Sequence, residues 1–203
     1  MFIPPLFKLE DRDEILGLMR TYSFATLVTD GENGLFATHL PVVVEREEPL
    51  VLAGHVSAAN AQKLDLASGK EAMLLFQGPH QYISPAWYQT SPNVPTWNYM
   101  AVHAYGRPEI VAAPAEVERH LVALANFIDP ELKTQKPESL EPEFLHRMFR
   151  GLVAFRLTVT RLEAKAKLNQ NKSPEDREAV VDRLSESLLD TDAVLAAAMR
   201  RLT

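Results

Sequence analysis

Apolar and polar residues alternate along much of the chain, which is the pattern of half-buried β-strands. The alternation predicts six strands, over 23–29, 35–44, 50–56, 72–78, 99–111 and 153–165. Turn-forming residues at 30–34 and 45–49 join the first three strands as successive hairpins. Six antiparallel strands with few helices between them indicate a mainly β fold with peripheral helices (α+β), closed or nearly closed into a barrel that leaves no strand edge exposed.

Helical spacing of apolar residues replaces the alternation in a few places. It predicts helices over 11–22, within 57–70, over 114–128 and 143–150, and through a C-terminal helical tail at 173–203. The tail opens with Ser173 followed by a proline, so we expect the serine to cap a helix whose first turn holds the proline.

A proline-rich stretch lies between the fourth and fifth predicted strands. Residues 79–98 hold four of the fourteen prolines of the chain. Proline cannot donate to a strand ladder, so this stretch is predicted to be ordered but irregular rather than a central strand. Its many aromatic residues fit a packed core, and together with His80, Asn93 and Asn98 they also fit a ligand pocket with apolar walls and a few polar groups.

Length and composition indicate one globular domain over residues 1–203 that works in a reducing compartment. The 203 residues are 46% hydrophobic and 24% charged, and none is cysteine. The absence of cysteine excludes disulfides and thiolate metal sites, and the acidic N-terminus does not resemble a signal peptide. No apolar run approaches the length of a membrane span, so the chain is expected to be soluble, cytoplasmic and without a membrane partner.

The net charge of −6 argues against a broad grip on DNA. Non-specific binding to nucleic acid depends on neutralising several phosphates with lysine and arginine. Direct DNA binding therefore has no support in the overall charge.

Four of the six histidines, at 39, 55, 80 and 103, fall in one half of the chain. No pair has the spacing of metal ligands, so the interpretation is that they form hydrogen bonds in a pocket or interface and that no metal is bound. Thr38 and His39 are adjacent on a strand and point to opposite faces, which excludes them as a nucleophile and base pair. Hydrolase chemistry is not supported.

Residues 54–63 are the better candidate for binding an anion. This segment runs from a strand into a helix and carries His55, Ser57, Asn60 and Lys63. Helix N-termini bind phosphates, whereas simple capping of the helix by Ser57 explains the same residues without a ligand. Both interpretations stay open, as does a second polar run, 167–172, which fits either a binding segment or a solvated loop.

Several stretches in chain order resemble one family. They are ATHLP at 37–41, Gly54-His55 followed by Asn60, FQGPHQYISPAWY at 76–88, VPTWNY at 94–99, VHAYG at 102–106 and KLNQN at 167–171. Together they resemble the PaiB family of FMN-binding negative transcriptional regulators, and the resemblance spans nearly the whole chain.

The resemblance implies a six-stranded antiparallel FMN-binding split β-barrel, like that of pyridoxamine 5′-phosphate oxidases and flavin reductases. It further implies a homodimer with FMN in clefts between the subunits. The residues it assigns to the cofactor, together with His55 from the anion-binding segment, are Thr38, His39, Leu40, Ser57, Asn60, Lys63, Trp97, Asn98, Lys167, Asn169, Gln170 and Asn171. Among them, Ser57, Asn60 and Lys63 would hold the phosphate.

Two functions remain open, because one fold hosts many activities. The family name implies a regulator that acts through flavin binding or redox sensing, and the acidic charge then favours indirect repression. The alternative is an FMN-dependent oxidoreductase that acts on a small substrate.

Overall fold

The computed structural model describes residues 1–32, 34–129, 143 and 148–201. The predicted helix over 143–150 falls largely outside the described residues. The described residues group into two compact units. One unit comprises Met1–Leu18, Gln77–Val102 and Glu163–Thr203, and the other comprises Met19–Phe76 and His103–Leu162.

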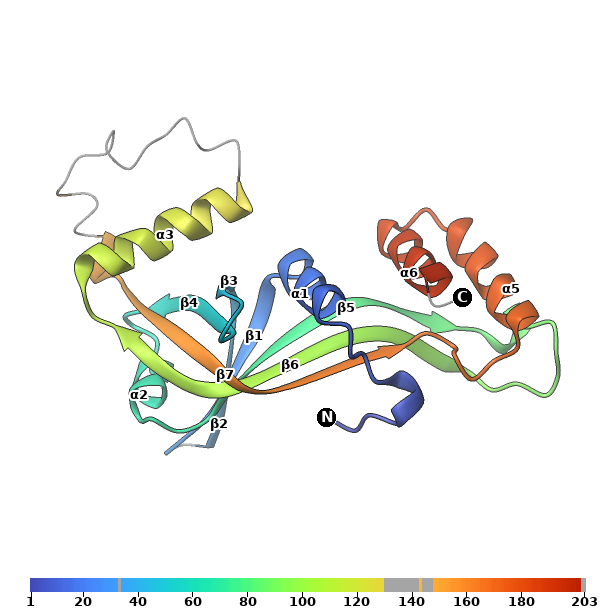
Figure 1. The fold of residues 1–203 in the computed structure, drawn as a ribbon, viewed down its shortest axis with the longest axis horizontal. Helices are drawn as coiled ribbons and strands as arrows, with labels where there is room; N and C mark the ends of the chain where they lie inside the picture. The colour runs from blue at the N-terminus through green and yellow to red at the C-terminus, as the bar shows by residue number, and fades with distance from the viewer. Residues whose placement is uncertain (33, 130–142, 144–147, 202–203) are drawn as a thin grey trace. The chain divides into compact units, whose positions relative to one another are not determined.

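The strands form a single mostly antiparallel sheet of seven members (Figure 1). They are β1 (Phe24–Gly31), β2 (Gly34–Pro41), β3 (Val43–Arg46), β4 (Val51–Ser57), β5 (Ala72–Ile83), β6 (Thr96–Val111) and β7 (Leu152–Lys167), in the spatial order β2-β1-β5-β6-β7-β4-β3. The mainly β fold class is confirmed. Among the described strands the ladder ends at β2 and at β3, so the barrel is not closed by hydrogen bonds there, and β2 remains an edge.

The seventh strand arises because the predicted strand 35–44 is divided. Pro41 ends β2 and has no N–H for a ladder. The next amide, that of Val42, donates instead to the carbonyl of Ser23 at 2.9 Å, and the chain re-enters the sheet as β3.

In the unit that holds β1 to β4, the core lies among the paired strands. Leu27, Leu52, Phe155 and Leu157 have no exposed surface. β1 pairs with β2, and β4 pairs with β7, both antiparallel. Two helices of this unit are α2 (Gln62–Ala67) and α3 (Pro114–Ile128). The predicted helix 114–128 is confirmed residue for residue, and its proline occupies the first turn as expected.

Helix α3 packs through one row of side chains. Val117, His120 and Leu124 are buried at helical spacing, and Leu124 clusters with Val43 of β3 and Ala53 of β4. The helix therefore rests on the strands along a narrow line.

The other unit holds the helical C-terminal tail. The tail consists of two helices that lie against each other, α5 (Pro174–Ser185) and α6 (Asp190–Arg201) (Figure 1). The predicted cap is confirmed, because the Ser173 side chain accepts a hydrogen bond from the amide of Asp176 at 3.2 Å. This unit also contains the short 3-10 helices Pro5–Phe7 and Pro85–Trp87, and α1 (Arg12–Thr21), whose last residues belong to the other unit.

The prediction that 79–98 is irregular is wrong at both ends. β5 continues to Ile83 and includes Pro79, and β6 already begins at Thr96. The described ladder between β1 and β5 covers only Met73–Leu75, so the missing N–H of Pro79 removes no bond to β1. The residues between the two strands are irregular, as expected.

Asp176 anchors α5 to the loop after β5. Its carboxylate accepts hydrogen bonds from the amides of Gln89 and Thr90, at 2.7 and 3.0 Å, and from the Thr90 hydroxyl at 2.6 Å. The Thr90 side-chain bond is the main cause that holds the pKa of Asp176 below its usual value. The ionised carboxylate is therefore the form that stabilises this unit.

We expect Asp176→Asn to lower the melting temperature at pH 7, because the amide keeps one acceptor and loses the charge that these three donors favour. Glu178→Gln, on an exposed position of the same helix, is the matched control and should leave the melting temperature unchanged. Thermal unfolding of both variants followed by circular dichroism provides the measurement. Equal melting temperatures for Asp176→Asn and the parent chain would contradict the anchoring role.

Candidate functional site

The turn between β4 and α2 is held by its own backbone and side chains. The amide of Asn60 donates to the carbonyl of Ser57 at 2.9 Å, and the Asn60 side-chain oxygen accepts from the amide of Gln62 at 2.9 Å. The Ser57 hydroxyl accepts from the amide of Ala59 at 3.2 Å. Ser57 therefore caps this turn and not α2, and α2 has only six residues. Any affinity of the turn for an anion must come mainly from side-chain donors.

Three half-buried side chains supply such donors. The Asn60 amide nitrogen donates to the Thr38 hydroxyl at 3.0 Å, which leaves the hydroxyl proton of Thr38 free for another acceptor. The Lys63 ammonium donates to the carbonyl of Ala58 at 2.6 Å, which holds it at the turn with two further protons to donate. Thr38, Asn60 and Lys63 thus form a polar group that joins β2 to the turn, with exposed Ser57 beside it.

Gln62 lies two residues after Asn60 at the start of α2, and no pattern in the sequence indicated its role. It has no exposed surface, and its side-chain nitrogen lies within hydrogen-bond distance of three oxygens: the carbonyls of Leu27 and Phe36 and the hydroxyl of Thr29. These bonds tie the start of α2 to β1 and β2. Only the structure reveals this brace, because its partners are 26 to 35 residues away.

His39 and Leu40, the two residues that follow Thr38 on β2, lie on opposite faces of the strand. The His39 ring contacts Thr26, its register partner, with 3.0 Å between Nδ1 and the hydroxyl, and stacks on Phe24. Leu40 is buried and lies close to Gly54, where a Cβ atom would come within 2.7 Å of it. The structure therefore separates His39 from the group formed by Thr38 and Asn60.

His55 lies apart from the turn residues as well. It follows Gly54 on β4 and so faces away from Leu40, and its ring meets that of His120 on α3, with 3.2 Å between Nδ1 and Nε2. Burial lowers the pKa of both rings, and for His120 the value falls to about 4. The sequence did not single out His120, although its position on the apolar row of α3 was a signal.

The remaining predicted cofactor residues belong to the other unit. Lys167 donates to the Thr96 hydroxyl and to the carbonyl of Trp97, the latter at 2.7 Å, so the end of β7 lies beside the start of β6. Burial lowers the pKa of Lys167, with a smaller effect from Lys165. The Trp97 side chain is 52% exposed and lies near the rings of His80 and Tyr82.

The amide residues of this second group are mostly engaged within the fold. Asn98 is fully buried and donates to the sulfur of Met199 at 3.5 Å, while its side-chain oxygen has no partner. Asn169 adopts a left-handed backbone with φ of 63° and donates to the Tyr88 hydroxyl at 3.2 Å. Gln170 bonds to the backbone of its own turn, and Asn171 is exposed.

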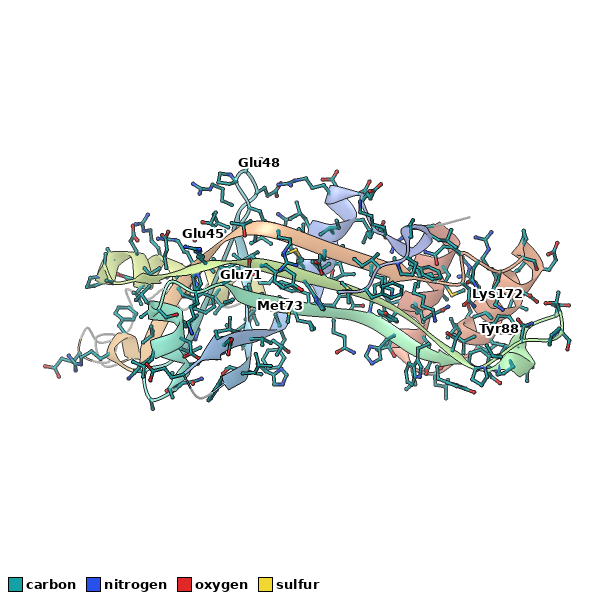
Figure 2. All side chains as sticks on the ribbon, turned by 90° about the horizontal axis from the view of Figure 1, so that it is seen from below. Glu45, Glu48, Glu71, Met73, Tyr88 and Lys172 are labelled. Carbon is teal, nitrogen blue, oxygen red and sulfur yellow. The ribbon has the colours of Figure 1, made fainter. Side chains whose placement is uncertain are left out.

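Tyr88 contacts both Asn169 and a second lysine, Lys172. The Lys172 ammonium lies 4.8 Å from the centre of the Tyr88 ring, and Figure 2 shows the two side chains together. Burial is the main cause that raises the pKa of the Tyr88 hydroxyl. The phenol therefore stays neutral at physiological pH.

No group of three or more histidine, aspartate or glutamate side chains converges in the part of the chain that the structure describes. None of the described helices is long and apolar enough to cross a membrane.

Comparison with known proteins identifies the family. Residues 1–161 match the model of the family described as "Putative FMN-binding domain". The chain is also 32% identical to the Bacillus subtilis protein "Protease synthase and sporulation protein PAI 2", over 91% of this chain and 89% of that protein. The chain belongs to the PaiB family of FMN-binding proteins. Its cofactor is FMN.

Solved structures share the fold of this PaiB-family chain. The flavocytochrome Anf3 from Azotobacter vinelandii aligns with a TM-score of 0.65 and 15% identity, over 85% of this chain and 75% of that one. The FAD and heme binding protein from Mycobacterium smegmatis aligns with a TM-score of 0.64 and 16% identity, over 85% and 78%. At such identities the likeness establishes the fold alone.

The residues at the β4–α2 turn have the chemistry that FMN requires. A phosphate needs several hydrogen-bond donors and a positive charge, and Thr38, Asn60 and Lys63 supply a hydroxyl, an amide and an ammonium at one point of the surface. A cavity of about 470 Å³ shares Ala61 with this turn. Leu35, Phe36 and Leu64 give it apolar walls, and polar side chains complete its lining: Glu32, Asp65, Ser68 and Lys70. A planar ring system needs apolar walls of this kind.

Proposed function

We propose that this PaiB-family chain binds the phosphate of FMN with Ser57, Thr38, Asn60 and Lys63, and that the bound flavin makes it a redox-sensing regulator. The observation that carries the phosphate site is the hydrogen-bonded group of Thr38, Asn60 and Lys63 at the β4–α2 turn. FMN supplies one- and two-electron redox chemistry when bound. The chain's own residues bind and orient it.

We propose indirect repression as the mode of regulation. The net charge of −6 opposes a grip on the DNA backbone, so a partner molecule is a better route to gene control. The lack of cysteine is consistent with work in the cytoplasm.

A homodimer is part of the same proposal. Residues Gly34–Ala37 of β2 are exposed, and Leu35 and Phe36 are 79% and 42% exposed at an edge of the sheet. Exposed apolar edges favour pairing with another chain. A second copy over this edge would lie beside the β4–α2 turn.

A single domain over residues 1–203 is also part of the proposal. It is supported by three strands that each run through both units: β5, β6 and β7.

Lys63→Ala should weaken FMN binding at least about tenfold, because a charge-assisted hydrogen bond to phosphate is worth about 1.5–3 kcal/mol. The melting temperature of the FMN-free protein should change little, since the ammonium is half-buried and bonds to one carbonyl. Fluorescence titration of FMN gives the affinity. Lys8→Ala is the matched control, because Lys8 is an exposed lysine that bonds to Glu10 and lies outside the turn and the cavity beside it. An unchanged FMN affinity for Lys63→Ala would remove Lys63 from the phosphate site.

The alternative function, an FMN-dependent oxidoreductase, has a direct test. The FMN-loaded protein is mixed with NADH or NADPH in air, and oxidation of the nicotinamide is followed by absorbance. Rapid multiple turnover would favour the enzyme, whereas a flavin that is reduced once and then held would favour the regulator.

A further inference from the structure

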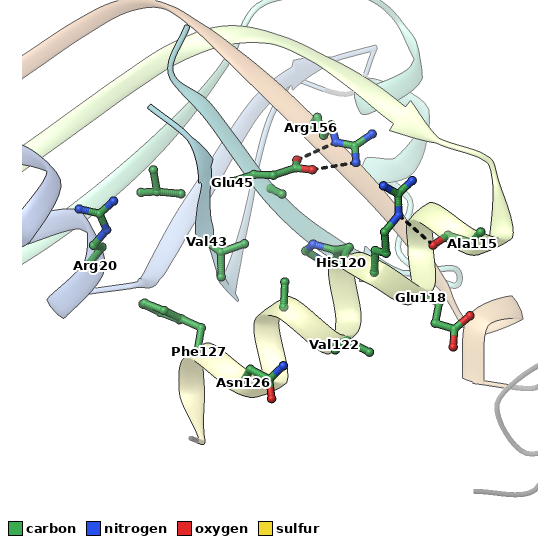
Figure 3. A pocket seen from close by; sticks show the side chains of 14 residues that line it. Arg20, Val43, Glu45, Ala115, Glu118, His120, Val122, Asn126, Phe127 and Arg156 are labelled. Carbon is green, nitrogen blue, oxygen red and sulfur yellow. Dashed lines mark hydrogen bonds and ion pairs between the residues drawn. The ribbon is translucent and has the colours of Figure 1, made fainter. Parts of the chain in front are cut away.

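A cavity of about 720 Å³ lies between α3 and the strands β3, β4 and β7 (Figure 3). All of its lining residues belong to one unit. Its volume falls in the range of small-molecule sites. It exists because α3 rests on the sheet only along the row of Val117, His120 and Leu124, which leaves the space beside that row unfilled.

The walls of the cavity are mainly apolar. Val43, Ala53, Val122 and Ala123 supply small aliphatic surfaces. Phe127 lines the same space and keeps 37% of its surface exposed. An aromatic ring in this position offers a face or edge to a planar ligand.

The cationic groups around the cavity already have carboxylate partners. Arg156 bonds to Glu45 in a bidentate pair, at 2.6 and 2.8 Å, and to Glu116 at 2.8 Å. Arg119 pairs with Glu116, and Arg20 pairs with Glu47. Figure 3 shows Glu45 reaching the guanidinium of Arg156 above the cavity. Because each of these arginines already has a carboxylate beside it, the described residues around the cavity carry no surplus positive charge to attract an anion, and the site favours an uncharged ligand.

His120 provides a polar contact inside the cavity. Its ring lines the cavity, and the contact of its Nε2 with Nδ1 of His55 leaves Nδ1 of His120 outside that contact. The groups that act on this ring are His55 from β4, Glu45 from β3 and Arg156 from β7. Burial and the neighbouring His55 keep the imidazole neutral, since its pKa is about 4.

We propose that this cavity is a binding site for a small uncharged aromatic molecule that carries one N–H or O–H group, of the phenol or indole class. The ligand's ring would pack against Phe127 and the aliphatic walls, and its polar hydrogen or oxygen would bond to His120. The site is separate from the β4–α2 turn. His120 lines the cavity and contacts His55, and His55 and Ser57 are two residues apart on β4. An occupant of the cavity would therefore lie close to the strand that ends at the proposed phosphate site.

The proposal is tested with indole as the probe on the full chain without FMN, so that its outcome does not depend on the flavin site. The ring nitrogens of 15N-histidine-labelled protein are followed by NMR during a titration with indole. The expected result is a saturable shift of the His120 and His55 signals, with the signals of exposed His39 unchanged. Benzoate, which has a similar ring and a negative charge, should bind at least about tenfold more weakly because it must desolvate a charge.

Ala123→Trp adds a bulky ring to the cavity lining and should weaken the indole-induced shift at least about tenfold in affinity, because overpacking a site is costly. Ala125→Phe, on the same helix but outside the cavity lining, is the matched control and should retain it. The proposal is overturned if indole causes no saturable His120 shift up to its solubility limit, if benzoate binds as tightly, or if a folded Ala123→Trp binds indole as well as the parent. Should Ala123→Trp not fold, the histidine shifts and the benzoate comparison decide the question.

Discussion

Gly106→Ala should destabilise the protein by about 1–3 kcal/mol or more, the cost of forcing extra atoms into a packed core. Gly106 is buried on β6, and a Cβ atom at this position would lie 2.2 Å from the carbonyl oxygen of Thr158 and 2.8 Å from the Leu157 side chain. The first of these neighbours is backbone, which cannot rotate away. The strands β6 and β7 would have to separate locally to admit a single methyl group.

Urea unfolding of Gly106→Ala, followed by circular dichroism, gives the free energy of unfolding. Gly17→Ala is the matched control, because Gly17 is exposed on α1 and nothing lies within 4 Å of its added Cβ. Alanine favours a helix over glycine by about 1 kcal/mol, so this control should be neutral or stabilising. A Gly106→Ala variant as stable as the parent would show that β6 and β7 do not approach as closely as described.

The stability of the unit that contains α3 should fall as the pH drops below about 6.5. The pKa of His120 is lowered from 6.5 to about 4 by burial and by His55, and burial lowers the pKa of His55 too. The unfolded chain therefore binds more protons than the folded chain between pH 6.5 and 4, and stability declines through that interval. The His120 contribution alone amounts to about 2 kcal/mol lost at pH 5.

His120→Gln should flatten this part of the profile, because glutamine does not titrate. His39→Gln, at an exposed histidine, should leave the slope unchanged. The free energy of unfolding of each variant is measured by urea titration from pH 7.5 to 4.5. A parent protein whose stability is constant between pH 7 and 5 would contradict the burial of the histidine pair.

Local patterns predicted most of the elements, and long-range pairing explains where they differ. The apolar run in 50–56 and the helical spacing in 114–128 match β4 and α3 closely, because β4 is buried on both faces over most of its length and α3 is buried along one row. The prediction ended β5 too early, because Pro79 was expected to interrupt the strand. Whether a strand accepts a proline depends on where its ladder ends, and the ladder between β1 and β5 ends before Pro79. The division at Val42 depends on Ser23, a residue nineteen positions away.

The strand-to-helix pattern indicated the candidate residues at 54–63, whereas the contribution of β2 could be found only through the family motifs. Thr38 and Asn60 are 22 residues apart, and nothing in the spacing predicts the hydrogen bond between them. Resemblance to the PaiB family named both. Gln62 and His120 were missed because each acts through partners that only the folded sheet brings near.

The surroundings of Gln62 restrict the type of residue that can occupy this position next to the β4–α2 turn. Its side-chain nitrogen faces three oxygens and has two protons, so one proton is shared. A glutamate has almost the same shape, yet it would place negative charge against those oxygens in a site with no access to water. Glutamine at this position therefore ties β1, β2 and α2 together in a way that an acid of the same size cannot, so the shape of the turn depends on a single amide group.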